Sequence, residues 1–403
     1  MNTNRTILHC DCNAYFASVE SIARPELKAV PMAVCGDPKS RHGVILAKNE
    51  LAKGYGIVTA ETVWQALKKC PVLTLVPPHH DLYEVYCQKI NAIYNQYTDQ
   101  VEMFSVDESW LDVTGSLHLF GTGREIADAL RRRVREELGI TISVGVSFNK
   151  IFAKLGSDYQ KPDATTEITP ENYRKLLFPL PARDMMFVGK MAAETLQNVG
   201  IQTIGDIVTA GKERMLALLG RSGESIWFYA SGLDCSPVKR YDATEKAKSV
   251  GSGTTFARDL VGMQDIRSGL LMLCDQVGTR LRRQGQFCTT VQVLIKDPRL
   301  ITISRQQKLA SATNVTKELF DTTVEIVSRA WPQSAPIRML TVTATGLTDN
   351  STVQMRLLDD SSEQRQKNAK LDVVMDEMRS KYGKDALTYA STVRRIAREP
   401  KKR

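Results

Sequence analysis

Two adjacent carboxylates lie inside a strand-like hydrophobic run, SVDESWLDV at residues 105–113. They are Asp107 and Glu108, and a third acid, Asp11, ends a similar run within ILHCDCNAYFASVE at residues 7–20. An unpaired buried carboxylate is costly, and a bound cation is one of the few partners that can hold several together. The pattern therefore constrains the chain to a fold in which the ends of these strands lie close together and bring their carboxylates to one place.

The acid pair has two interpretations. An Asp-Glu pair beside Ser is common in tight turns, and an acid at a strand end is often simply solvated. Apolar residues on both sides favour instead a hairpin packed on a core. These residues are Met103, Phe104, Val106, Trp110, Leu111 and Val113. Magnesium prefers hard oxygen ligands, so three converging acids predict metal-assisted phosphoryl or nucleotidyl transfer.

Length and cysteine usage indicate a soluble cytosolic enzyme. A chain of 403 residues predicts two to four domains. We expect neither membrane insertion nor secretion, because no run of about 18 apolar residues occurs and the N-terminus enters a strand pattern directly. The eight cysteines form no C-x-x-C pair. Cys10 and Cys12 straddle Asp11 and should point to the opposite face of the strand from it, as small residues in a reducing compartment.

The chain is basic, with a net charge of +9 and a pI of about 9.1. Its positive charge is clustered in three places. The clusters are Arg131, Arg132, Arg133 and Arg135; Arg280, Arg282 and Arg283; and Arg394, Arg395, Arg398, Lys401, Lys402 and Arg403. Any one cluster is more often a solvated face than a binding site. Several of them, on a chain with an acidic metal site, favour a polyanionic partner, with nucleic acid first.

The N-terminal part reads as an α+β unit interrupted by an insertion. The pattern predicts strands at 5–10, 101–106, 109–114 and 141–147 and helices at 14–22, 81–99 and 122–138. Between the first acid and the acid pair, residues 23–80 form a small inserted unit with several glycines and lysines. We expect the sheet to carry the acids and the insertion to cover them.

From about 168 to 234 the pattern is helical with short loops. Gly189 and Lys190 begin one helix, and Gly200 follows it before a second helix opens near Thr203. This resembles a helix-hairpin-helix element, whose glycines let backbone N–H groups approach a phosphate. Glycine at an ordinary helix end is the alternative.

After a linker at 235–247, the segment 248–348 reads β-α-β-β-α-β, a small sheet with helices on one face. The predicted strands are 248–256, 288–296, 300–307 and 337–346, with helices at 264–284 and 315–331. Lys248, Arg305, Lys308 and Arg338 are placed as expected for an open sheet face lying against phosphates. A solvated strand face has a similar composition.

These landmarks together resemble the Y-family DNA polymerases, the translesion class, over nearly the whole chain. The matching stretches are Asp11 with the following Tyr15-Phe16-Ala17-Ser18-Val19-Glu20, then Ser105-Val106-Asp107-Glu108, and then SVGVSFNKIFAKLGSDYQKPD at 143–163. The resemblance implies a multidomain α+β fold, a right-hand polymerase with a ferredoxin-like palm and a helix-hairpin-helix thumb. Its implied parts are a palm (1–22 and 81–167), fingers (23–80), a thumb (168–234), a little-finger domain (248–348) and a tail (349–403).

The resemblance also implies roles for single residues. Asp11, Asp107 and Glu108, with the backbone carbonyl of Cys12, would be the ligands of two Mg²⁺ ions, for which Mn²⁺ could substitute. Phe16 would be the steric gate that clashes with a ribose 2′-hydroxyl, although an aromatic packed in the core is the alternative. The residues that would contact the incoming nucleotide are Tyr15, Phe16, Lys53 and Lys161.

Three positions depart from the family pattern. Asn13 stands where many members have a second Asp, so a supporting carboxylate is missing there. Glu50 stands near a usual hydroxyl-bearing phosphate contact, and Lys53 replaces an Arg. A lysine lacks the bidentate fork of a guanidinium, so we expect altered triphosphate affinity or lesion preference.

The tail contains a further motif. Gln354-Met355-Arg356-Leu357-Leu358 resembles the short peptide with which bacterial polymerases bind the sliding clamp, through Gln354, Leu357 and Leu358. Five-residue patterns of this kind also arise by chance. Residues 370–387 have helical periodicity before a basic end.

The sequence thus predicts a monomeric, template-directed, error-prone DNA polymerase of the bacterial cytoplasm and nucleoid, acting on primer-template DNA and dNTPs. No segment remains for a proofreading exonuclease. The alternative is a non-catalytic DNA- or clamp-binding relative that regulates forks, with the changed fingers positions as signs of decay. A palm-based nucleotidyl cyclase would leave the helix-hairpin-helix and the basic C-terminal domain without a purpose.

Overall fold

The protein is described by a computed structural model that covers residues 4–38, 43–243, 246–349, 361–383 and 386–390. Its contacts divide the chain into two units, Met1–Thr244 and Glu245–Arg403. The division falls inside the predicted linker, and each unit has hydrophobic cores of its own. Within the described ranges, no helix combines the length and the apolar character needed to cross a membrane.

The first unit is built on a five-stranded sheet with the order β5-β6-β1-β7-β8. Its strands are β1 (Ile7–Cys12), β5 (Val101–Met103), β6 (Glu108–Asp112), β7 (Ile142–Ser147) and β8 (Thr165–Ile168). Four of them lie where the alternating pattern predicts strands, while β8 was not predicted. The central strand β1 pairs antiparallel with β6 on one side and with β7 on the other.

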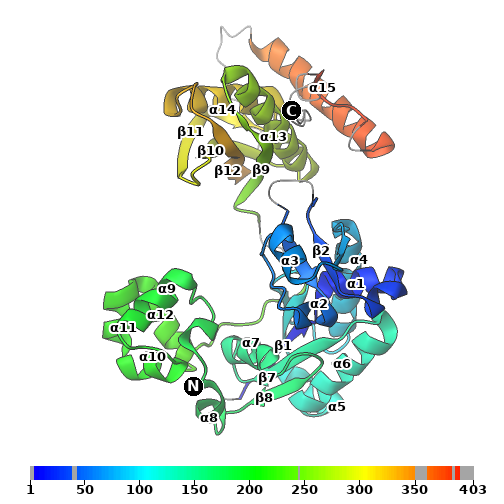
Figure 1. Ribbon diagram of the computed structural model, residues 1–403, viewed down its shortest axis with the longest axis vertical. Helices are drawn as coiled ribbons and strands as arrows, with labels where there is room; N and C mark the ends of the chain where they lie inside the picture. The colour runs from blue at the N-terminus through cyan, green and yellow to red at the C-terminus, as the bar shows by residue number, and fades with distance from the viewer. Residues whose placement is uncertain (1–3, 39–42, 244–245, 350–360, 384–385, 391–403) are drawn as a thin grey trace. The chain divides into compact units, whose positions relative to one another are not determined.

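Helices cover the two faces of this sheet, which Figure 1 shows in blue to green. The helices are α1 (Tyr15–Ala23), α4 (His80–Tyr94), α5 (Leu117–Phe120), α6 (Gly123–Leu138) and α7 (Lys150–Tyr159). Cys10 and Cys12 are buried in the core beneath α4 and α6. Asp11 lies on the other face, where it meets α7. The two cysteines and Asp11 therefore lie on opposite faces of β1, as the alternation of side chains along a strand predicts.

The contact between α7 and the sheet is unusually close at two glycines. Gly156 of α7 lies so near Gly145 of β7 that a Cβ on Gly156 would be 3.0 Å from the Gly145 Cα. A Cβ on Gly145 would lie 1.9 Å from the carbonyl oxygen of Ala153. This close approach brings the polar side chains of α7 down onto the sheet.

A small α/β unit lies within residues 23–80. Its sheet has the order β3-β2-β4, with β2 (Met32–Cys35), β3 (Ile45–Lys48) and β4 (Thr74–Val76). Beside it are a 3-10 turn (Pro25–Ala29) and the helices α2 (Glu50–Gly54) and α3 (Val63–Lys69). A capping box of Thr62 and Gln65 begins α3.

Residues 168–234 are helical, as predicted. The helices are α8 (Tyr173–Leu177), α9 (Lys190–Asn198), α10 (Ile204–Ala210), α11 (Lys212–Leu219) and α12 (Arg221–Ala230), with a 3-10 turn at Ala182–Asp184. Gly200 connects α9 to α10 with a φ of +82°, a conformation that favours glycine. A capping box of Thr203 and Asp206 begins α10.

The first part of the predicted linker is not separate from the sheet. The backbone N–H of Lys239 donates to the Glu102 carboxylate (3.0 Å), and that of Tyr241 donates to the Asp99 carbonyl (3.1 Å). Val238 is buried between these contacts and the core. Residues 238–241 are therefore held against the segment that contains β5, through the Glu102 side chain and the Asp99 carbonyl.

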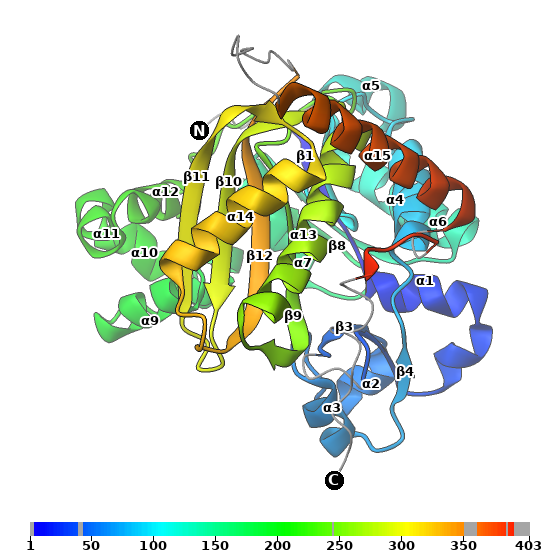
Figure 2. The same ribbon diagram turned by 90° about the horizontal axis from the view of Figure 1, so that it is seen from above.

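The second unit has the predicted β-α-β-β-α-β order. Its elements are β9 (Ser249–Leu260), α13 (Met263–Arg283), β10 (Phe287–Lys296), β11 (Thr302–Thr313), α14 (Thr316–Ala330) and β12 (Ile337–Thr348). The sheet order is β11-β10-β12-β9, and α13 and α14 lie side by side on one face (Figure 2). The other face carries mainly hydroxyl and amide side chains.

The register corrects one expectation for this open face. Arg305 pairs with Val293, whose side chain is buried under the helices, so Arg305 lies on the helix side of the edge strand β11. Lys308 pairs with Thr290 on the open side. Arg338 is half-buried and lies at the register irregularity between Ile337 and Met339, so alternation along β12 does not assign it to the open side.

A long helix, α15 (Ser361–Tyr382), covers part of α13 and α14. Arg282 of α13 contacts Asp372 (3.1 Å) and Asp376 (2.6 Å) of α15. Asp372 also accepts a hydrogen bond of 2.8 Å from the backbone N–H of Thr316 at the start of α14. The tail helix begins earlier than the predicted periodicity indicated, and charge pairs hold it to the domain.

Substituting Gly145 by Ala should destabilise the first unit strongly. The added methyl group meets rigid backbone, and overpacking of this kind costs about 3 kcal/mol. Urea denaturation would measure the change, with Gly54→Ala as control, because Gly54 ends α2 and has nothing within 4 Å of an added Cβ. The control should change stability by no more than about 0.5 kcal/mol. Equal stability of the two variants would contradict the close α7 contact.

Candidate active site

Asp11 and Glu108 lie opposite each other on neighbouring strands. They pair in the β1–β6 register, so their side chains share the face that α7 covers. The Lys154 ammonium of α7 bridges them, at 2.9 Å from Asp11 Oδ2 and 2.5 Å from Glu108 Oε1. The three side chains are largely buried. Two carboxylates thus share one cation at the end of the sheet.

A second lysine completes the cluster. The Lys161 ammonium lies 2.8 Å from Asp11 and 2.8 Å from Asp158. Lys154 also contacts Asp158, at 3.1 Å. Three carboxylates therefore surround two ammonium groups.

The surroundings shift the proton affinities of these groups in opposite directions. Burial and the hydrogen bond with Asp11 raise the pKa of Glu108 to about 7. Burial also disfavours the charged form of Asp11, but the hydrogen bond with Glu108 and the two lysines outweigh it and lower its pKa to about 2. Although burial lowers the pKa of Lys154, its three carboxylates raise it above the ordinary value. The lysines thus keep Asp11 ionised at neutral pH.

Asp107 is near but does not join this cluster. Its carboxylate accepts a 2.6 Å hydrogen bond from Ser105 Oγ, and its carbonyl accepts one from the Cys12 N–H (3.0 Å). Among the residues that the structure describes, no three His, Cys, Asp or Glu side chains are grouped closely enough to hold a metal ion. The structure therefore brings together two of the three predicted carboxylates, with Lys154 between them.

The hairpin around the acid pair is only partly packed on the core. Trp110, Leu111 and Val113 are buried as predicted. Met103 and Phe104, however, are 52% and 51% exposed, and Val106 is also exposed. The expectation of a fully packed hairpin is wrong on its β5 side, because that side opens onto a pocket instead of a core.

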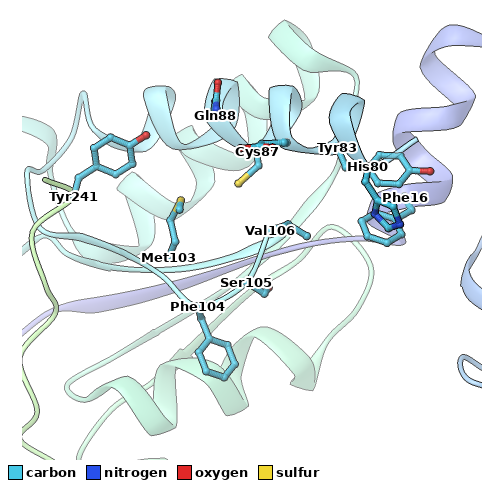
Figure 3. Close-up of a pocket in the computed structure, with 11 residues that line it drawn as sticks. Phe16, His80, Tyr83, Cys87, Gln88, Met103, Phe104, Ser105, Val106 and Tyr241 are labelled. Atoms are coloured by element: carbon cyan, nitrogen blue, oxygen red, sulfur yellow. The ribbon is translucent and has the colours of Figure 1, made fainter. Parts of the chain in front are cut away.

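This pocket has a volume of about 580 Å³ and an aromatic lining. Figure 3 shows Phe16, His80 and Tyr83 gathered at one end, and Tyr241 at the other. Phe16 stacks on Tyr83 with ring centroids 4.1 Å apart and planes inclined by 12°. Tyr15 is buried, and its hydroxyl donates to the Tyr83 carbonyl (2.6 Å). Phe16 is therefore held at the pocket wall, while the Tyr15 side chain supports it from the core.

Most of the other predicted site residues lie in exposed positions, while Arg338 is half-buried. Lys53 pairs with Glu50 at 3.3 Å on α2, so two of the family departures contact each other. Gly189 caps α9, and Lys190 beside it has a side chain 87% exposed. The predicted clamp motif at 354–358 lies outside the described residues.

Sequence reasoning did not single out Lys154. Its signal was its spacing, because Lys150, Lys154 and Asp158 recur every four residues and so share one face of α7. The pattern could not show that this face lies over Asp11 and Glu108. Tyr83 was likewise missed, since its ring meets Phe16 only in three dimensions.

Family comparison fits this geometry. Residues 10–158 match the model of the impB/mucB/samB family. Residues 247–357 match the model of the C-terminal domain of the same family. The chain belongs to the impB/mucB/samB family. The matched N-terminal range of this family member contains all three predicted carboxylates and Lys154.

Similar proteins share nearly the full length of this family member. It is 43% identical to the DNA polymerase IV of Acetivibrio thermocellus over 379 residues, which cover 94% of this chain and 95% of that relative. It is 34% identical to the DNA polymerase IV of Clostridium acetobutylicum (95% and 97% covered). With DNA polymerase IV 2 of Bacillus subtilis it shares 33% identity (98% and 96% covered). The predicted membership of the Y-family translesion class is confirmed.

A solved structure confirms the fold class. The Y-family DNA polymerase chimera Dbh-Dpo4(243-245)-Dbh superposes with a TM-score of 0.76 at 24% identity, covering 86% of this chain and 100% of that one. The predicted multidomain polymerase fold is therefore correct for this family member.

Replacing Lys154 by Met should destabilise the protein in metal-free buffer. The variant leaves Glu108 beside Asp11 with Lys161 as the remaining cation, and loss of one partner from a buried charge pair costs about 2 kcal/mol in such a partly compensated case. Urea denaturation in chelator would measure it. Lys190→Met is the matched control, because Lys190 is exposed and lies 3.9 Å from Glu194. Unchanged stability of the Lys154 variant would contradict the bridging role.

Proposed function

We propose that this Y-family DNA polymerase adds deoxynucleotides to a primer 3′ end under template direction, with Asp11, Asp107 and Glu108 as metal ligands. The observation that carries the proposal is that Asp11 and Glu108 lie opposite each other on the neighbouring strands β1 and β6. The Lys154 ammonium bridges the two carboxylates. If the phosphates of a substrate attract Lys154 and Lys161, the two carboxylates lose their counter-charge, and a metal cation would then stabilise them most.

The donor set fits magnesium. Carboxylate oxygens are the hard ligands that Mg²⁺ prefers, and the Lys154 ammonium stands where a cation is favoured. Asp11, Glu108, Asp107 after rotation away from Ser105, and the Cys12 carbonyl would hold two Mg²⁺ ions, or Mn²⁺ in their place. Bound metal would supply charge neutralisation for the triphosphate and a lower pKa for the primer hydroxyl.

The remaining residues would select and hold the nucleotide. Lys161 and the exposed Lys53 would contact the triphosphate as point charges. Phe16, fixed by its stack on Tyr83, would exclude a ribose 2′-hydroxyl from the pocket wall. Tyr15 is buried, so its contribution would come from its backbone.

DNA would be held mainly through its backbone, without base readout. The proposed contacts are Gly189, Lys190, Gly200, Lys248, Lys308, Arg338 and, from the edge strand, Arg305. We also propose clamp binding through 354–358, a monomeric state and action at the bacterial nucleoid. We further propose that synthesis is error-prone and proceeds without proofreading, in keeping with the family to which the chain belongs.

Primer extension with single dNTPs tests the catalytic proposal. The Asp107→Asn/Glu108→Gln double variant should lose at least about 1,000-fold in rate, since the metal-based charge stabilisation is removed. The variant should still bind primed DNA in an anisotropy assay. A wild type that binds primed DNA but does not extend it with Mg²⁺, Mn²⁺ or clamp present would favour the non-catalytic fork-binding relative instead.

Phe16→Ala tests the gate separately. The truncated side chain removes the clash with the 2′-hydroxyl, so ribonucleotide incorporation relative to deoxynucleotide should rise by about 100-fold or more. Phe104→Ala is the control, because Phe104 is an exposed aromatic of the same pocket that does not stack on Tyr83. Equal gains in both variants would argue against a specific gate.

A further inference from the structure

Asn13 departs from the family pattern, yet its side chain makes two hydrogen bonds within the first unit. It follows β1 directly, and its side chain is buried. Its amide Nδ2 donates to Ser143 Oγ (2.9 Å), and its Oδ1 accepts from the backbone N–H of Asp163 (2.9 Å). The side chain therefore joins the end of β1 to β7 and to the loop after α7.

The backbone of Asn13 is fixed as well. Its N–H donates to the Thr141 carbonyl (2.9 Å), and its own carbonyl accepts from Ser18 Oγ (2.8 Å). Asn13 thus has a single position between the strand and α1. The loop residue that the amide binds is therefore placed relative to Asp11, which lies two residues earlier, on β1.

The residue that the amide holds, Asp163, is clamped from the other side too. Its carboxylate accepts from Arg131 Nη2 (3.0 Å) and Arg135 Nη1 (2.8 Å), both on α6. Its φ of +52° is unusual for a residue with a side chain and needs such support. The loop is therefore anchored at Asp163 by Asn13 and by two arginines.

Lys161 lies two residues before this anchor. Its ammonium is 2.8 Å from Asp11 Oδ2, so the loop determines where the lysine meets the site. Asn13 and Asp11 belong to the same strand end, and the amide connects that strand end to the lysine's loop. The amide of Asn13, which stands where many family members have a carboxylate, therefore binds the loop that carries Lys161.

We propose that Asn13 is a positioning residue that holds the 160–163 loop so that Lys161 is aligned with the triphosphate of the incoming nucleotide. The inference rests on the proposed role of Lys161. An amide suits the task because its oxygen accepts from the backbone N–H of Asp163 while its nitrogen donates to Ser143. Its effect should be on nucleotide binding, with the catalytic carboxylates unchanged.

Single-nucleotide insertion kinetics on full-length protein test the proposal. Asn13→Ala should raise the KM for dNTP about tenfold, because small misplacements of a positioning group are costly, and should change kcat less than about threefold. The Kd for primed DNA should not change. Asn13→Asp keeps an acceptor for the Asp163 N–H and can accept from the Ser143 hydroxyl, so it should recover most of the wild-type KM.

The same measurement in a Lys161→Ala background separates positioning from general loosening. If Asn13 acts through Lys161, Asn13→Ala should then raise KM less than about twofold further, as coupled sites are not additive. An equal rise in both backgrounds would overturn the inference. A raised KM in Lys161→Ala with a wild-type KM in Asn13→Ala would also overturn it while leaving the proposed role of Lys161 intact. No change in either variant would refute both.

Two further variants complete the design. Asn172→Ala is the matched control, because the Asn172 side chain, in a loop after β8, also makes two hydrogen bonds: it accepts from the Thr169 N–H and donates to the Glu167 carbonyl. It should leave the KM for dNTP unchanged. If Asn13→Ala fails to fold, Ser143→Ala removes one anchor of the amide and should raise KM by a smaller factor in the same direction. A wild-type KM in a folded Ser143→Ala variant would then count against the proposal.

Discussion

The site depends on the repulsion between two carboxylates held side by side. The β1–β6 register fixes Asp11 opposite Glu108 on a face covered by α7, where water cannot screen them fully. Lys154 and Lys161 supply the opposite charge. Any substrate that attracts those lysines leaves the carboxylates in need of another cation. The same arrangement therefore stabilises the protein without metal and, under the function proposed above, provides a metal site once nucleotide is bound.

Delivery of the lysines depends on a steric constraint. The Gly145 and Gly156 contact lets α7 approach the sheet at backbone distance, which a side chain at either position would prevent. Lys154 on that helix then reaches both strands. The loop after α7 brings Lys161 back to Asp11, and Asn13 ties that loop to the strand it approaches. The position of α7 on the sheet thus determines where Lys154 meets the carboxylates and where the loop that carries Lys161 begins.

Three expectations differ from the structure, each for a reason that the local sequence pattern does not contain. Met103 and Phe104 read as core residues by their apolar character, but their side chains are exposed and line a pocket. Arg305 read as an open-face cation, but its pairing with the buried Val293 places it on the helix side. Asp107 read as part of a converged triad, but a hydrogen bond from Ser105 holds it aside.

The sequence by itself determined four of the five strands in the sheet that carries Asp11 and Glu108, the β-α-β-β-α-β order of the second unit, the division near 235–247, the candidate carboxylates and the family. Hydrophobic periodicity and motif spacing are local properties, which is why they could be read from the sequence. Only the tertiary structure decided that Lys154 bridges Asp11 and Glu108, that Tyr83 supports Phe16 and that Asn13 holds the Lys161 loop. These contacts join residues that are far apart along the chain, and their geometry depends on strand register and helix packing, which no local pattern encodes.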